Sequence, residues 1–248
     1  MARRLPLHGR AARRGRVQRR PKLHLLPRLL GLAAARSAQP LVKNEVARDA
    51  GLHAVTLDEY LGYLETVFLV RTVQAWASSP TTARTRTPKV HVTDTGLASA
   101  LLGIDADRLA RDPARAGPLL ESFVVNELGR QLAAAGATRY ALSHLRTRDG
   151  REVDVVLERA DGRVAAVEVK GGATVRAGDA RNLRWLAERL GDRFVSGVLL
   201  YTGDRVVALG DRITLVPISR CGRHRTMAGK LQMPADEGAA LRRPPGLG

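Results

Sequence analysis

The chain has 248 residues, of which 44% are hydrophobic and 4% aromatic, and its formal net charge is +17. This length suffices for one large or two small domains, whose core must consist mainly of Leu, Val and Ala. The single cysteine, Cys221, excludes an internal disulfide and a cysteine-based zinc cluster. No apolar run reaches membrane-spanning length and no secretory signal is present, so we expect a cytoplasmic protein without a membrane partner.

The positive charge is concentrated at the two ends of the chain. Residues 1–22 carry +9 and residues 220–248 carry +4, which leaves only +4 for residues 23–219. Neither end has apolar periodicity, so we expect a disordered basic arm over 1–22 and a disordered tail over 220–248. Such segments add non-specific, salt-sensitive affinity for phosphate. The net charge alone is therefore weak evidence for a nucleic-acid-binding core.

Residues 23–93 have the element order of a winged helix. Apolar spacing predicts helices over Leu25–Ala38, Lys43–Ala50 and His53–Val67, followed by strands over Phe68–Val73 and Lys89–Val92. In a winged helix the third helix enters the major groove and the hairpin contacts the DNA backbone. Because acidic residues lie near the start of the third helix, the loop between the strands is the better candidate for DNA binding, through Arg84, Arg86 and Lys89. The alternative is that this unit only packs against a neighbouring domain or partner.

The remainder of the chain predicts a layered α/β domain. After a connector over residues 94–118, a strong amphipathic helix is expected over Leu119–Ala135. Strands follow near residues 140–145, 152–157, 164–169 and 195–201, with a helix over 179–190 before the last of them. A final hairpin is expected over 206–209 and 213–218. This order is typical of an α/β layer with a mixed sheet.

Two of these strands carry acidic residues among apolar ones. Asp154 lies between valines, Glu168 lies between Val167 and Val169, and the turn at Asp161-Gly162 favours a hairpin. A buried carboxylate is costly unless it is paired or holds a cation. Carboxylate oxygens are suitable ligands for Mg²⁺, and Lys170 would supply a compact positive charge beside the metal. The alternative is that both acids are edge-strand charges paired with Arg151 or Lys170.

These segments together resemble a known family. A helix with Glu121, then Asp154, then Glu168-Val169-Lys170, looks like the PD-(D/E)xK nuclease fold of archaeal Holliday-junction resolvases and many restriction enzymes. Residues 24–219 more closely resemble the C-terminal half of a group of prokaryotic AAA-type ATPases. In that group a P-loop domain precedes a winged helix and a nuclease-like domain of unknown function. The supporting segments are residues 60–65, 68–70, 88–90, 94–97, 120–128, 146–154 and 168–170.

The resemblance implies both a fold and a set of site residues. The fold is α/β, with an N-terminal winged helix-turn-helix over 23–93, a connector over 94–118 and a restriction-endonuclease-like mixed-sheet α/β domain over 119–219. Asp154 and Glu168 would bind Mg²⁺, Lys170 would be the catalytic lysine, and Glu121 would be the helical acid, with Glu127 as its alternative. No G-x-x-x-x-G-K-[ST] occurs, so we expect no nucleotide site of the P-loop kind. A truncated or frame-shifted ATPase gene would give this pattern.

Three functions follow as hypotheses. The first is a DNA-associated nuclease-like module of an AAA-type ATPase that hydrolyses phosphodiesters with Mg²⁺. The second is a non-catalytic DNA-binding, docking or regulatory module of such an ATPase, which need not bind metal. The third is a winged-helix transcription regulator, whose sequence-specific DNA binding would survive deletion of residues 119–248. The expected partners are DNA and either an ATPase domain or further copies of this chain.

Overall fold

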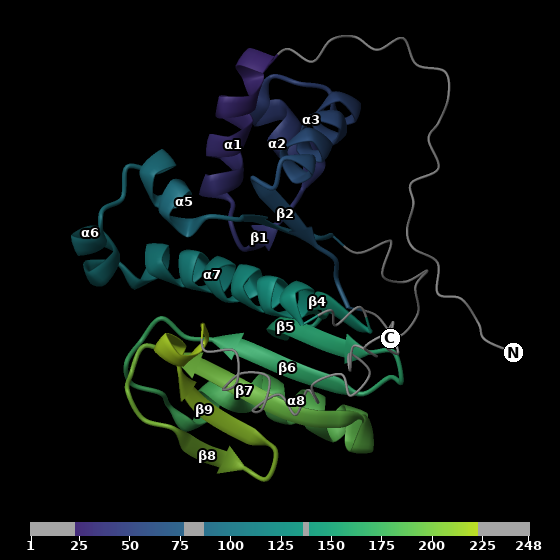
Figure 1. Ribbon diagram of the computed structural model, residues 1–248, viewed down its shortest axis with the longest axis vertical. Helices are drawn as coiled ribbons and strands as arrows, with labels where there is room; N and C mark the ends of the chain where they lie inside the picture. Colours follow the sequence, from purple (N-terminus) through teal and green to yellow (C-terminus); the bar gives the residue numbers. More distant parts are fainter. Residues whose placement is uncertain (1–22, 77–86, 136–138, 223–248) are drawn as a thin grey trace, which may run out of the picture.

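The computed structural model describes residues 23–76, 87–135 and 139–222. These residues form an N-terminal unit of helices with a small sheet, and a larger unit built on a six-stranded sheet. The long helix α7 (Pro113–Ala134) lies between the two units (Figure 1). The structure is therefore a mixed α/β fold with helices and a mixed sheet.

The N-terminal unit packs three helices against a three-stranded antiparallel sheet. It contains η1 (Leu23–Leu25), α1 (Leu26–Ala35), α2 (Lys43–Ala50) and α3 (Ala54–Thr66). The sheet order is β1 (Gln39–Pro40), β3 (Lys89–Val92), β2 (Val70–Val73), with β3 in the centre. The predicted end of α2 is confirmed, because Gly51 takes a left-handed conformation at φ 68° that favours glycine. The two-residue strand β1 was not predicted, since Gln-Pro has no strand pattern.

The connector contains two short helices and the start of α7. They are α5 (Thr95–Leu101) and α6 (Ala106–Arg111), and the side chains of Asp94 and Asp105 cap them. The predicted start of the long helix at Leu119 is wrong, because α7 begins at Pro113. Asp112 accepts hydrogen bonds from the backbone N–H groups of Ala114 and Arg115 there. The helix continues through Pro118 although proline lacks the N–H that a helix interior uses.

The larger unit contains the mixed sheet that the sequence predicts. Its order is β4-β5-β6-β7-β9-β8, in which the β6–β7 and β7–β9 pairs are parallel and the others antiparallel. The strands are β4 (Tyr140–Arg146), β5 (Glu152–Arg159), β6 (Val164–Val169), β7 (Phe194–Tyr201), β8 (Val207–Gly210) and β9 (Ile213–Pro217). Between β6 and β7 lie η2 (Ala177–Ala180), α8 (Arg181–Leu190) and η3 (Gly191–Arg193), and η4 (Ile218–Arg220) follows β9.

Helices cover both faces of this sheet. Val124 and Leu128 of α7 pack with Val155 and other residues of one face, whereas Leu183 and Leu186 of α8 pack on the opposite face. Because both faces are buried, the strands are nearly continuous in apolar residues, and any charge on them must be paired. Among the described residues, no helix is both long enough and apolar enough to cross a membrane.

A β-bulge in β5 changes which residues face α7. Ser143 of β4 pairs with Val156, but Leu145 pairs with Val153, so Asp154 and Val155 together oppose a single residue of β4. Strict alternation would place Val153 and Val155 on the same face of the sheet. Instead, Val153 packs on the α8 face and Val155 on the α7 face. The bulge thereby allows Asp154 to face α7 together with its neighbour Val155.

Candidate functional site: an acidic cluster around Lys89

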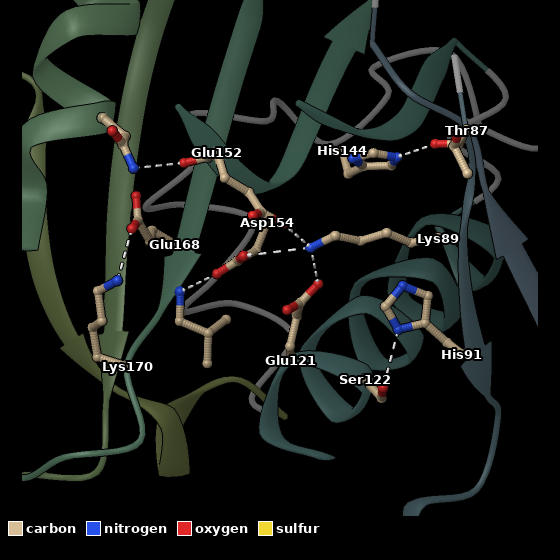
Figure 2. A network of polar contacts seen from close by, with 12 residues as sticks. Thr87, Lys89, His91, Glu121, Ser122, His144, Glu152, Asp154, Glu168 and Lys170 are labelled. Atoms are coloured by element: carbon tan, nitrogen blue, oxygen red, sulfur yellow. Dashed lines mark hydrogen bonds and ion pairs between the residues drawn. The ribbon is translucent and has the colours of Figure 1, made fainter. Parts of the chain in front are cut away.

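The most unusual polar group of the described structure is the side chain of Lys89 on β3. It is 1% exposed, and its Nζ lies 2.7 Å from Glu121 Oε1, 2.5 Å from Glu152 Oε1 and 3.8 Å from Asp154 Oδ1. Figure 2 shows the ammonium between these three carboxylates, which come from α7 and β5. We call Lys89, Glu121, Glu152 and Asp154 the Lys89 cluster.

The Lys89 cluster joins the two units of the fold. On β3, Val90 and Val92 belong to the core of the N-terminal unit. Residues alternate along a strand, so Lys89 and His91 point the other way, towards α7. The prediction that Lys89 contacts DNA from an exposed loop does not fit this position, because a buried ammonium paired with carboxylates cannot reach a phosphate. Arg84 and Arg86, the other two predicted DNA contacts, lie outside the described residues.

The electrostatics of Lys89 are dominated by its three carboxylate neighbours. Burial disfavours the ammonium, but the charges of Glu121, Asp154 and Glu152 outweigh it and raise the pKa of Lys89. Burial also disfavours the ionised form of Glu152, but the Lys89 ammonium outweighs that effect and lowers the pKa of this carboxyl. The ion pairs of Lys89 therefore hold a charged lysine inside the protein.

The other two acids of the cluster, Glu121 and Asp154, are not fully neutralised by the positive charge near them. Burial, with a further contribution from Asp154, raises the pKa of Glu121 to about 8 despite the nearby Lys89. Burial likewise raises the pKa of Asp154, although Asp154 Oδ2 accepts a hydrogen bond of 2.8 Å from the backbone N–H of Val169. One ammonium thus does not balance the three carboxylates around it.

Glu168 and Lys170 form a separate pair at the end of β6. Lys170 Nζ donates a 2.8 Å hydrogen bond to Glu168 Oε1. Val167 packs on the α7 face of the sheet and Ala166 on the α8 face, so alternation places Glu168 on the α8 face, opposite to the Lys89 cluster. The Glu168 side chain is 6% exposed, and its Oε2 has no hydrogen-bond partner among the described residues. Burial raises the pKa of Glu168 to about 6.

A line of buried polar contacts continues the junction between the two units. His91 Nδ1 lies 3.0 Å from Ser122 Oγ, and Asn126 Nδ2 donates a 2.9 Å hydrogen bond to the Val92 carbonyl. His144 Nε2 lies 3.3 Å from the Thr87 carbonyl. Burial, reinforced by Lys89, lowers the pKa of His91 to about 3 and that of His144 to about 4. Both imidazoles are therefore neutral at physiological pH, which suits a junction that already holds a buried ammonium.

The structure brings together only part of the predicted site. Glu121 and Asp154 meet, while Glu168 and Lys170 pair with each other and Glu127 pairs with Arg130 at 2.7 Å. Glu152 was not among the predicted site residues, although its spacing of two from Asp154 was a usable signal. In the part of the chain that the structure describes, no three His, Cys, Asp or Glu side chains are grouped so as to hold a metal ion. In this arrangement the carboxylates of Glu121, Glu152 and Asp154 form ion pairs with the Lys89 ammonium and do not form a Mg²⁺ site.

A separate hollow lies near the ends of β6 and β7. Its volume is about 820 Å³, and it is lined mainly by apolar groups that include Leu119, Leu120, Phe123 and Ile218. Gly171, directly after Lys170, also lines it. Such a lining offers little to a phosphate, which needs cationic or N–H donors. The hollow is therefore chemically distinct from the Lys89 cluster.

Two family matches together cover most of the described chain. Residues 116–221 match the family described as Domain of unknown function (DUF4143). Residues 15–108 match the family described as Domain of unknown function (DUF8612). The boundary between the two matches falls in the connector, between the two units of the fold.

Longer proteins of mycobacteria are similar to this chain. Uncharacterized protein Mb2031c of Mycobacterium bovis and Uncharacterized protein Rv2008c of Mycobacterium tuberculosis are each 31% identical to it over 175 residues. The alignments cover 70% of this chain and 37% of each relative, so the chain spans little more than a third of their length.

Among solved structures, a chain of the Thermococcus gammatolerans assembly of McrB AAA+ hexamers with bound McrC is a distant match. It is 12% identical, with a TM-score of 0.27, over 79% of this chain and 72% of that chain.

Proposed function

We propose that this chain is a nuclease-like module of an AAA-type ATPase that docks or regulates without cutting DNA. In this proposal residues 23–93 are a winged helix and residues 119–219 a restriction-endonuclease-like domain. The observation that carries it is the Lys89 ammonium, which lies among Glu121, Glu152 and Asp154 where a nuclease of this kind would need a metal. In this proposal the buried ammonium takes the position of a metal ion among these carboxylates, although it does not neutralise all three of them.

The link to an ATPase rests on the sequence. The segments from Tyr60 to Lys170 resemble the C-terminal half of prokaryotic AAA-type ATPases, and DUF4143 is a domain often found in proteins associated with such ATPases. The mycobacterial relatives are much longer than the matched region, which leaves room for a further domain in them. The proposal therefore predicts that a P-loop motif is encoded beside this gene.

The absence of catalysis is tested with purified protein, Mg²⁺ and labelled DNA in single-stranded, duplex and branched forms. We expect no cleavage above that of the Asp154→Ala and Lys170→Ala variants, and no heat of Mg²⁺ binding in calorimetry. Mg²⁺-dependent cleavage by the unaltered protein that both variants lose would contradict the proposal.

A second candidate function is Mg²⁺-dependent phosphodiester hydrolysis, with Asp154 and Glu168 as metal ligands and with Lys170 and Glu121 in catalytic roles. The observation that favours it is the unpartnered Oε2 of Glu168, a buried acceptor close to the end of the strand. Hydrolysis would need a different arrangement, in which Lys89 leaves the carboxylates and Glu168 approaches Asp154. The cleavage assay above decides between the two candidates.

DNA contact by the winged helix is part of the first proposal. Each arginine that neutralises a phosphate releases counterions, so affinity falls with salt at a slope of roughly −0.9 for each phosphate. Fluorescence anisotropy with duplex DNA should show a slope that becomes shallower by about two in an Arg84→Ala, Arg86→Ala double variant. An unchanged slope would exclude the wing arginines as phosphate contacts.

A further inference from the structure

The Lys89 cluster connects three elements that are distant in the sequence. Lys89 is on β3 of the N-terminal unit, Glu121 is on α7, and Glu152 and Asp154 are on β5. Because the ammonium is within 4 Å of carboxylates from both α7 and β5, it links the N-terminal sheet to the helix and strand of the larger unit. No other lysine or arginine of the described residues forms ion pairs with three carboxylates at such low exposure.

An ammonium and a divalent cation are both stabilised by several oxygen atoms around a compact positive charge. A lysine ammonium presents three N–H donors to acceptors around a compact charge. A hard divalent cation takes carboxylate oxygens in the same way, at shorter distances. The oxygens of Glu121, Glu152 and Asp154 converge on the Lys89 ammonium from two elements, and they are of the ligand type that a hard divalent cation takes.

The charges near this point show that one ammonium is not enough. The three acids Glu121, Glu152 and Asp154 surround one ammonium group, that of Lys89. The carboxylates therefore retain a capacity for positive charge that the protein itself does not fill.

We propose that Lys89 is a built-in cation that closes the acidic cluster to divalent metal ions, and that removal of its ammonium converts Glu121, Glu152 and Asp154 into a divalent-cation site. This inference deepens the proposed function, because it explains how a nuclease-like domain is kept free of metal. The same carboxylates either pair with Lys89, which attaches the N-terminal unit, or bind a metal ion. Metal binding and attachment of the N-terminal unit therefore exclude each other. A partner that withdrew β3 from α7 would expose the site.

The test compares the thermal unfolding of full-length variants with and without Mn²⁺, a divalent probe for oxygen ligands. Lys89→Met removes the charge and keeps the length of the side chain, while Lys89→Arg keeps the charge. Lys43→Met is the matched control, because Lys43 Nζ pairs with Asp58 at 2.8 Å but both side chains are nearly half exposed. A ligand at 100 times its Kd that binds only the folded state raises the Tm of a chain this size by roughly 5–10 °C.

We expect Mn²⁺ to raise the Tm of Lys89→Met by about this amount and to leave the unaltered protein, Lys89→Arg and Lys43→Met within about 1 °C. Equal responses of Lys89→Met and the unaltered protein, including no response in either, would overturn the inference. If Lys89→Met does not fold, Lys89→Gln, which also removes the charge but keeps N–H donors for the carboxylates, is measured in its place. Adding Asp154→Asn to either variant should abolish the Mn²⁺ effect.

The outcomes separate this inference from the proposed function. Cleavage of DNA by the unaltered protein would refute the non-catalytic function, whatever Mn²⁺ does to Lys89→Met. A Mn²⁺ response confined to Lys89→Met would support the inference even if neither protein cuts DNA. An absent response in Lys89→Met would refute the inference and leave the docking function standing.

Discussion

Replacement of Lys89 by methionine should strongly destabilise the protein in the absence of divalent metal. The side chain is 1% exposed and pairs at 2.7 and 2.5 Å with Glu121 and Glu152, so the substitution leaves partly buried carboxylates without their counter-ion. Removing one partner of a buried ion pair costs about 3–5 kcal/mol. Glu152 is 35% exposed and regains some hydration, so the lower end, about 3 kcal/mol, is the expected cost. This is a large share of the roughly 5–15 kcal/mol that stabilises a typical domain.

The loss is measured by urea unfolding at pH 7.5 in the presence of EDTA. With a slope of about 2 kcal/mol per molar urea, a loss of about 3 kcal/mol lowers the midpoint by roughly 1.5 M. Lys43→Met, which breaks the exposed pair with Asp58, should cost no more than about 1 kcal/mol. If Lys89→Met unfolded within about 1 kcal/mol of the unaltered protein, the Lys89 cluster would not be a buried network and the argument built on it would fail.

Two further predictions concern the protonation of Glu121 and the backbone conformation of Gly51. Glu121 has a pKa of about 8 when folded and an ordinary value of 4.5, so the folded state binds more protons and stability falls as pH rises from about 5 to about 8. The free energy of unfolding, measured by urea titration and compared with that of Glu121→Gln, should fall by at most about 1.4 kcal/mol per pH unit over this range. A rise in this free energy would contradict the assignment. Gly51→Ala should cost about 1 kcal/mol, because φ is 68° and a Cβ would meet open space, so only backbone strain contributes. Gly31→Ala, inside α1 and equally uncrowded, should instead stabilise by up to about 1 kcal/mol, and equal effects of the two substitutions would refute the conformational argument.

Local signals predicted most of the secondary structure. The end of α2 followed from Gly51, and the antiparallel β5–β6 hairpin followed from the turn at Asp161-Gly162. The mixed sheet followed from the order of helices and strands. Each of these features depends on residues that are close in the sequence, where propensity and turn geometry act. The early start of α7 was missed because its cap, Asp112, lies before a Gly-Pro pair that normally ends a helix.

The arrangement of the site depends on contacts that no local pattern encodes. Asp154 was predicted as an acid among apolar strand residues, but the bulge that allows it to face α7 arises from a register shift against β4. Glu168 was grouped with Asp154 because the two strands are neighbours, yet alternation along β6 places it on the opposite face of the sheet. Lys89 was placed at the surface because its loop neighbours are polar. Its burial is a tertiary effect, created when α7 covers the outer face of β3.

The two faces of α7 explain why the units belong together. Val124, Val125 and Leu128 face the six-stranded sheet, whereas Glu121, Ser122 and Asn126 contact β3. On β3, Val90 and Val92 enter the N-terminal core, which leaves Lys89 and His91 to meet this polar side of the helix. If either unit were isolated, the polar side chains at the junction would be exposed to water and would lose their hydrogen-bond and ion-pair partners on the other unit. The two sequence matches are separated between residues 108 and 116, in the connector, but the two units share this layer of polar contacts, so metal access and unit separation must change together at Lys89.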